Sequence, residues 1–202
     1  MVNLVDVGHG NILSLKNWIN FCGHHVKIIK NPSEFDGSTI ILPGMCNSYS
    51  LMMALKDQKL DSEIIKRVNK GQKIVGICAG MQIMGKYIVE DKGCDGLSLV
   101  KYTTKELNSE SSYSLINNGW IDIKSDHIFQ STRDIRFILG RYYFNHQYYM
   151  FGKEENNCDL LVKHSIFSSE IISFFIKKNI IGMQFHPEKS QDSGYRIGKL
   201  IL

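Results

Sequence analysis

The sequence predicts an α/β protein: an open, mostly parallel β-sheet flanked by helices and extended by antiparallel edge strands. Two observations carry this prediction. In the first half of the chain, short apolar runs alternate with stretches of helical periodicity, and strands that alternate with helices pair in parallel through right-handed crossovers. Beyond Gly96 the chain changes to shorter apolar runs, which indicate antiparallel strands at one edge of the sheet.

The first half supplies the expected parallel strands and their helices. Apolar runs that end at glycine-rich or Pro-Gly turns are interpreted as strands, and the helical stretches between them stop at Gly23 and Gly71. We expect strands over residues 2–7, 26–29, 38–42 and 73–78, one or two helices over 48–69, and helices over 12–22 and 79–84.

In the second half, the sequence predicts several strands followed by a C-terminal helix. The turn at residues 177–179 predicts a hairpin between the last two strands. No linker, repeat or change of composition divides the chain, so we expect a single domain over residues 1–202. The expected strands are 121–123, 142–150, 160–162, 171–176 and 180–185, with a short helix over 194–202.

Composition excludes several classes of function. The net charge of +4 comes from lysines and arginines scattered among acids, so it favours an ordinary solvated surface over a nucleic-acid partner. Apolar runs are far shorter than the ~20 residues that span a bilayer, and no basic leader opens the chain, so we expect no membrane contact and a cytoplasmic location. Five cysteines without a C-x-x-C pair, and histidines without ligand spacing, predict no disulfide framework, no metal and no cofactor.

A candidate nucleophile stands at the junction of the fourth expected strand and its helix. The segment Gly76-Ile77-Cys78-Ala79-Gly80 has the form Gly-x-nucleophile-x-Gly, in which two glycines permit a tight turn that exposes the central side chain. The start of the following helix favours a thiolate at this position. The competing interpretation is a buried structural cysteine beside glycine, and the five residues alone do not exclude it.

Two more turns supply candidate partners for Cys78. His186 and Glu188 follow the last expected strand and provide an imidazole and a carboxylate that could hold it, although a solvent-exposed loop histidine is the alternative. The Pro-Gly turn that ends at Gly44 and Met45 should face the same crevice, because ligands bind outside the carboxyl ends of parallel strands. Backbone N–H groups of Gly44, Met45 and Ala79 could then form an oxyanion hole, unless the turn only ends a strand.

Together these segments resemble the class I (triad) glutamine amidotransferases, whose fold is flavodoxin-like, and within them the family of glutaminase subunits of imidazole glycerol phosphate synthase. The resemblance covers nearly the whole chain in order. The matching segments are Asp-Val-Gly-His-Gly-Asn at 6–11, Leu-Pro-Gly at 42–44, Gly-Ile-Cys-Ala-Gly-Met-Gln at 76–82, Gly-Trp at 119–120, the segment 143–148 and Gly-Met-Gln-Phe-His-Pro-Glu-Lys-Ser at 182–190.

The resemblance implies a role for each matching residue. Cys78 would be the nucleophile, His186 the general acid and base, and Glu188 its orienting carboxylate. Glutamine would be held by Gln82 and by the backbone near Gln147 and Tyr148. Contacts with a synthase partner would come from Trp120, Tyr143 and Lys189.

The implied chemistry is hydrolysis of the glutamine side-chain amide. The sulfur attacks the carboxamide, backbone N–H groups hold the oxyanion, and the imidazole protonates the departing ammonia. Ammonia is protonated in bulk water, so it must pass directly to an acceptor. The resemblance implies that the acceptor site lies on a separate cyclase subunit, a (β/α)₈ barrel of histidine biosynthesis, in a heterodimer.

Three departures from the family pattern leave alternatives open. Met45-Cys46 replaces the usual Val-Gly, which could restrict the peptide flip that completes the oxyanion hole; Ile121 replaces the usual Asn; and Asn145 and Gln147 replace small or apolar residues. The alternatives are a paralogue that supplies another synthase, such as one that amidinates surface-polysaccharide sugars, a γ-glutamyl hydrolase that needs no partner, and a degenerate glutaminase that only binds.

Overall fold

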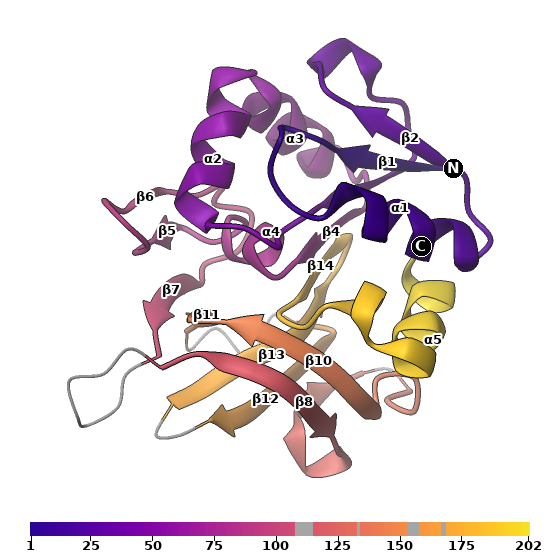
Figure 1. Cartoon of the computed structure of the whole chain (residues 1–202), viewed down its shortest axis with the longest axis vertical. Coiled ribbons are helices and arrows are strands. Elements are labelled where there is room, and N and C mark those ends of the chain that lie inside the picture. Colours follow the sequence, from indigo (N-terminus) through magenta and orange to yellow (C-terminus); the bar gives the residue numbers. More distant parts are fainter. Residues whose placement is uncertain (108–114, 133, 153–157, 167–168) are drawn as a thin grey trace.

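The structure, a computed structural model, describes residues 1–107, 115–132, 134–152, 158–166 and 169–202. Its centre is an eight-stranded sheet in the order β2-β1-β3-β4-β14-β13-β12-β9 (Figure 1). The first five strands in this order are parallel and the last three are antiparallel, so the sheet is mixed as the sequence predicts. The prediction was wrong for β14, which the sequence grouped with the antiparallel edge and which pairs in parallel with β4. The strands are β1 (Val2–Val5), β2 (Val26–Ile29), β3 (Thr39–Leu42), β4 (Ile74–Ile77), β9 (Ile128–Ser131), β12 (Leu160–Ile166), β13 (Ser169–Lys177) and β14 (Ile180–Met183).

Alternating side chains of the parallel strands build two separate cores. Helices α1 (Ile12–Phe21) and α5 (Gln191–Ile201) pack on one face, against residues such as Ile41 and Val75. Helices α2 (Ser48–Asp57) and α3 (Leu60–Asn69) pack on the other face, against Ile40 and Ile74. Because these strands are buried on both faces, their sequences are continuous apolar runs, and this pattern allowed them to be predicted.

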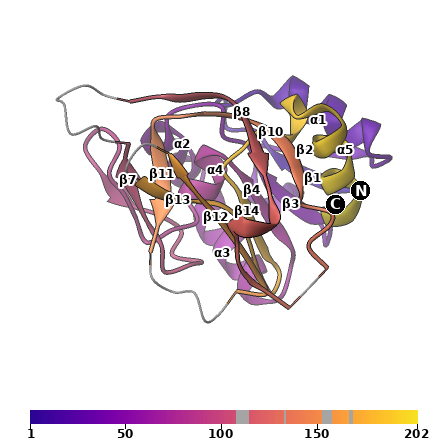
Figure 2. The ribbon, with the colours of Figure 1, turned by 90° about the horizontal axis from the view of Figure 1, so that it is seen from below.

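Two smaller sheets cover the antiparallel half. Strands β8 (Asn117–Ile123) and β10 (Gly140–His146) form an antiparallel pair on the α1 and α5 side, as Figure 2 shows. Strand β11 (Tyr148–Phe151) joins β5 (Tyr87–Ile88), β6 (Cys94–Asp95) and β7 (Thr103–Glu106) in a four-stranded sheet. None of the helices in the described ranges is both long and apolar enough to cross a membrane.

Several sequence expectations about elements were wrong in detail. The expected strand over 142–150 is two strands that part at Gln147 and enter different sheets, because β10 pairs with β8 whereas β11 pairs with β7. The helix expected over 79–84 ends earlier, as α4 (Ala79–Gln82), and α5 begins at Gln191, three residues before Gly194. The sequence did not predict β5, β6, β7 or β9, whose two to four residues carry little periodicity.

The topology gathers three chain segments at one edge of the sheet. Strands β3, β4 and β14 are neighbours and run parallel, so their carboxyl ends lie side by side. The residues that follow these ends are Pro43, Cys78 and Gln184, which begin the three turns that the sequence singled out.

Candidate functional site

Cys78 occupies a strained turn between β4 and α4. Its φ of 53° and ψ of −113° are unfavourable for a residue with a side chain, and such strain persists where the surroundings over-determine it. Neighbouring glycines make the turn possible: a Cβ on Gly76 would lie 2.6 Å from the Gly80 carbonyl oxygen, and one on Gly80 would overlap the carbonyl of Leu42. The Gly-x-Cys-x-Gly pattern therefore builds the elbow that the sequence predicts.

His186 and Glu188 form a buried ion-pairing unit beside this elbow. His186 Nδ1 lies 2.9 Å from Glu188 Oε1, and both side chains are fully buried. Glu188 Oε1 also accepts a hydrogen bond of 2.6 Å from Asn11 Nδ2, at the start of α1. Glu188 Oε2 and His186 Nε2 have no well-aligned partner among the described residues. The carboxylate is thus held from two sides through one oxygen, and the Nε2 atom remains available for chemistry.

The environment of His186 favours its charged form. Burial of the ring lowers the pKa of His186, but the neighbouring Cys78 and Glu188 side chains outweigh burial and raise it to about 10. A thiolate beside an imidazolium is the arrangement in which each charge stabilises the other. These three side chains are therefore suited to nucleophilic attack by sulfur followed by proton donation.

A second polar unit, formed by Gln82 and Gln184, also contacts Cys78. The Gln82 side-chain amide donates to the carbonyl of Tyr148 (2.6 Å) and to Gln184 Oε1 (3.2 Å), and Gln184 Nε2 lies 3.5 Å from Cys78 Sγ. The Tyr148 carbonyl also takes a contact of 3.0 Å from His146 Nδ1. Because a carbonyl only accepts, both neighbours must present N–H groups to it.

The sulfur opens onto a cavity of about 340 Å³. Each of the six residues that the sequence assigned to substrate binding lines it, together with Cys78: Gly44, Met45, Ala79, Gln82, Gln147 and Tyr148. Its other lining residues are Cys46, Asn47, Glu90, Ile116, Asn145 and His146. His186 and Glu188 are not among the residues that line the cavity.

The expected oxyanion hole is closed in this structure. The backbone N–H of Ala79 donates to the carbonyl oxygen of Gly44 at 3.2 Å, so this donor is occupied by the protein itself. Gly44 packs so tightly on the elbow that a Cβ there would overlap the Ile77 carbonyl. The Gly44–Met45 peptide must therefore rotate before the turn can offer an N–H and free the one at Ala79.

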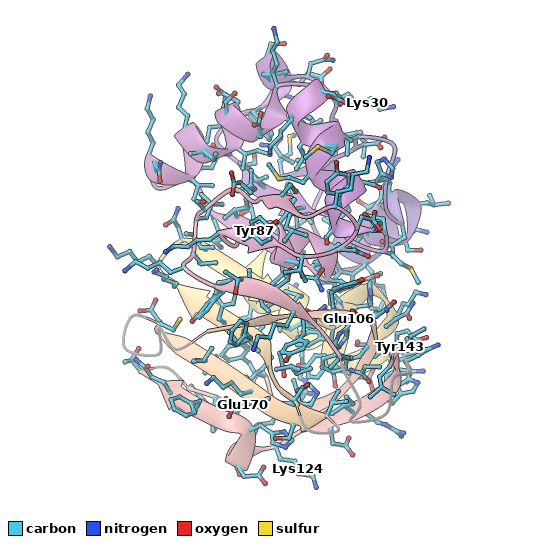
Figure 3. The ribbon with its side chains drawn as sticks, turned by 90° about the vertical axis from the view of Figure 1, so that its left-hand side faces the viewer. Lys30, Tyr87, Glu106, Lys124, Tyr143 and Glu170 are labelled. Carbon is cyan, nitrogen blue, oxygen red and sulfur yellow. The ribbon has the colours of Figure 1, made fainter. Side chains whose placement is uncertain are left out.

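The three residues expected at a partner contact lie together on the surface. Tyr143 stacks edge-on against Trp120 with ring centroids 5.7 Å apart, and Lys189 Nζ lies 5.5 Å from the centre of the Tyr143 ring. Trp120 is 38% exposed, and Figure 3 places Tyr143 at the margin of the strand-rich half. The backbone N–H of His186 donates to the Tyr143 carbonyl, so this aromatic cluster is tied directly to the histidine loop.

The sequence analysis assigned no role to three residues of the site. Asn11 and Gln184 lie inside motifs that the sequence singled out, but their contacts with Glu188 and Cys78 join residues 177 and 106 positions apart. Glu90 lies in the cavity wall, where its Oε2 accepts from the N–H and hydroxyl of Ser48. No local pattern marks Glu90. Among the described residues, no group of three His, Cys, Asp or Glu side chains could hold a metal ion.

Comparison of the sequence with known families and proteins gives consistent matches. The family model of the CobB/CobQ-like glutamine amidotransferase domain matches residues 8–113, which include Cys78. The imidazole glycerol phosphate synthase subunit HisH of Oceanobacillus iheyensis is 32% identical over 201 residues, covering 98% of this chain and 96% of that protein. The subunit named HisH 2 of Nitrobacter winogradskyi is 29% identical, covering 97% and 94%.

Solved structures share the fold. A crystal structure of a glutamine amidotransferase aligns over 100% of this chain and 96% of its own, with a TM-score of 0.72 and 17% identity. The structure of PurLQS from Thermotoga maritima aligns over 99% and 96%, with a TM-score of 0.71 and 20% identity. At these identities the likeness concerns the α/β fold, in agreement with the architecture predicted from the sequence.

Proposed function

Because this chain belongs to the class I glutamine amidotransferases, we propose that it acts over residues 1–202 as the glutaminase subunit of an imidazole glycerol phosphate synthase. In this role it hydrolyses glutamine to glutamate and ammonia. The full-length similarity to HisH subunits supports the choice of synthase. The observation that carries the proposal is the buried unit of Cys78, His186 and Glu188 behind a cavity of about 340 Å³.

The cavity offers groups that suit glutamine. Both N–H bonds of the Gln82 amide are occupied by Tyr148 and Gln184, so its Oε1 is the atom left to accept from a ligand. Glu90 is the single carboxylate among the described lining residues, and it suits the α-ammonium group of an amino acid. An acceptor and an anion in the lining of one cavity favour a ligand that carries N–H groups.

The reaction follows from the geometry around the sulfur. Cys78 attacks the substrate carboxamide as a thiolate, and the imidazolium of His186 donates its Nε2 proton to the leaving ammonia. Glu188 holds the ring through Nδ1 and stabilises its positive charge. Water then cleaves the γ-glutamyl thioester, with neutral His186 as the base.

Activation requires a rearrangement of the oxyanion turn. The N–H of Ala79 is released only when the Gly44 carbonyl rotates away, and the same rotation turns the N–H of Met45 toward the substrate. In the proposed mechanism, the closed turn is therefore the resting state. Cys46 follows Met45 where the family has glycine, so the rotation starts from a less flexible turn.

A partner subunit receives the ammonia. We propose a cytoplasmic heterodimer with a (β/α)₈ cyclase barrel, which docks on the face that carries Trp120, Tyr143 and Lys189. The backbone bond between Tyr143 and His186 gives such docking a direct mechanical connection to the triad. The second chemistry, closure of the imidazole ring, belongs to the barrel.

Glutamate release tests the proposal. The purified chain is assayed with glutamine alone, with a histidine-pathway barrel subunit, and with the barrel plus its ribonucleotide ligand. Strong stimulation by the liganded barrel is expected. A basal rate that the barrel leaves unchanged would assign the chain to another synthase, and efficient hydrolysis of γ-glutamyl peptides without any partner would assign it to the hydrolases.

A further inference from the structure

Gln184 is a polar side chain in a position where burial is costly. It follows β14 directly, is 0% exposed, and lies two residues before His186. A buried amide must find hydrogen-bond partners for its N–H and carbonyl groups, since leaving them unpaired costs several kcal/mol. Its backbone N–H donates to the Ser173 carbonyl at 2.9 Å, which fixes the backbone of the residue in the sheet. The side-chain amide needs hydrogen-bond partners of its own.

The hydrogen-bond network determines which end of the Gln184 amide faces the sulfur. The Tyr148 carbonyl can only accept, so the Gln82 amide must turn its nitrogen toward Tyr148. The same nitrogen of Gln82 also donates to the Gln184 side chain, so the Gln184 atom that accepts must be Oε1. Consequently Gln184 Nε2, at 3.5 Å, donates toward Cys78 Sγ.

A donor at this position discriminates between the two states of the sulfur. A thiolate accepts a hydrogen bond more strongly than a thiol does, because the acceptor is charged. The thioester that forms after attack has lost that charge. The Gln184 contact is therefore strongest in the state that attacks, and it is separate from the contact between His186 and Glu188.

We propose that Gln184 is a further catalytic residue, whose side-chain amide donates to the Cys78 sulfur and stabilises the attacking thiolate. Because Gln184 is oriented by Gln82, which lines the cavity, the same relay connects occupation of the cavity to the nucleophile. This inference rests on the proposed glutaminase function for its catalytic meaning. The hydrogen bond itself can be tested without turnover.

The test is the pH dependence of Cys78 alkylation by iodoacetamide in the isolated full-length chain, with the modified cysteine identified by peptide mass spectrometry. Gln184→Met conserves volume and removes the donor. At pH 7 it should lower the alkylation rate about 10-fold, which is the effect of one hydrogen bond to a charged group, and move the rate curve to higher pH. In the barrel complex, kcat for glutamine should fall more than KM changes.

Two further variants keep the test decisive. Ser173→Ala is the control, because it removes a fully buried hydroxyl of the neighbouring strand that pairs with His164 and not with Cys78. This variant should lower the unfolding temperature but leave the pH dependence of alkylation unchanged. Gln184→Glu preserves shape and the acceptor for Gln82 but brings negative charge to the sulfur, so it should slow alkylation further than Gln184→Met. It also carries the test if the Met variant does not fold.

The outcomes separate this inference from the proposed function. An alkylation curve in Gln184→Met and Gln184→Glu that coincides with that of the wild type would overturn the role of Gln184, even if the wild-type complex releases glutamate. A shifted curve in a chain that releases no glutamate with any barrel would support the hydrogen bond and refute the proposed function.

Discussion

Asn11 offers the sharpest test of how the triad is held. Its Nδ2 donates at 2.6 Å to Glu188 Oε1, the oxygen that also faces His186, and Glu188 Oε2 has no partner in the described part of the chain. Asn11→Ala therefore removes the one side-chain hydrogen bond, other than that with His186, that the structure shows to Glu188 Oε1. A hydrogen bond to a charged group is worth about 1.5–3 kcal/mol, which corresponds to a loss of about 10- to 150-fold in kcat/KM.

The same substitution should spare the helix that Asn11 precedes. Asn11 is the N-cap residue of α1, but its side chain makes no capping hydrogen bond. By contrast, the Asn47 side chain caps α2 by accepting from Ser50 N–H at 2.8 Å, and its loss should cost about 1 kcal/mol of stability. Helix content by circular dichroism should therefore be unchanged in Asn11→Ala.

The assay is glutamate release by the complex with the barrel, measured from pH 6 to 9. Asn11→Asp retains the shape but sets a carboxylate against Glu188, so it should be less active than Asn11→Ala at neutral pH and recover partly as the pair takes up a proton at lower pH. Asn17→Ala, on the exposed face of α1, is the matched control. If Asn11→Ala retained kcat/KM within twofold of Asn17→Ala, a positioning role for Asn11 would be refuted.

Three other predictions concern the nucleophile, the partner face and the buried histidines. Cys78→Ala should abolish glutamate release while leaving the unfolding temperature and barrel binding near wild type; residual turnover would contradict the assignment of the nucleophile. Lys189→Ala should reduce stimulation by the barrel more than the unstimulated rate, and equal losses in both would argue against a partner contact. Burial lowers the pKa of His164 to about 4 and of His146 to about 3, so the unfolded chain binds protons that the folded chain does not, and stability should fall as pH drops from 6.5 toward 4. Urea midpoints across this range should show the decline, and His164→Gln should flatten it; an unchanged slope would contradict this account.

Much of the site could be predicted from local sequence. The elbow at Cys78 depends on two glycines within two residues of it, and the turns at Gly44 and His186 follow apolar strands that are short and continuous. Parallel strands bring their carboxyl ends to one edge, so the sequence pattern places the Gly44 turn and the Cys78 elbow in one crevice. The turn at His186 joins them because β14 is parallel to β4, which the structure shows. The roles given to individual side chains came from the resemblance of the motifs to a family, not from periodicity.

The strand-rich half resisted prediction because its pairing partners are distant in sequence. No local pattern in residues 142–150 predicts that β10 pairs with β8 whereas β11 pairs with β7. The chain passes from one sheet to the other at Gln147. This change of sheet depends on tertiary packing, because Phe144 is buried in one core and Met150 in the other.

The sequence by itself determined the α/β architecture, the position of the nucleophile and the turns that accompany it, because each depends on residues adjacent in the chain. Only the tertiary structure decided that Asn11 holds Glu188, that Gln184 donates to the sulfur, and that the Gly44 carbonyl occupies the N–H of Ala79. These are directional contacts between segments that lie far apart in the chain. Hydrogen bonds depend on distance and angle in three dimensions, and residue order does not encode those directly.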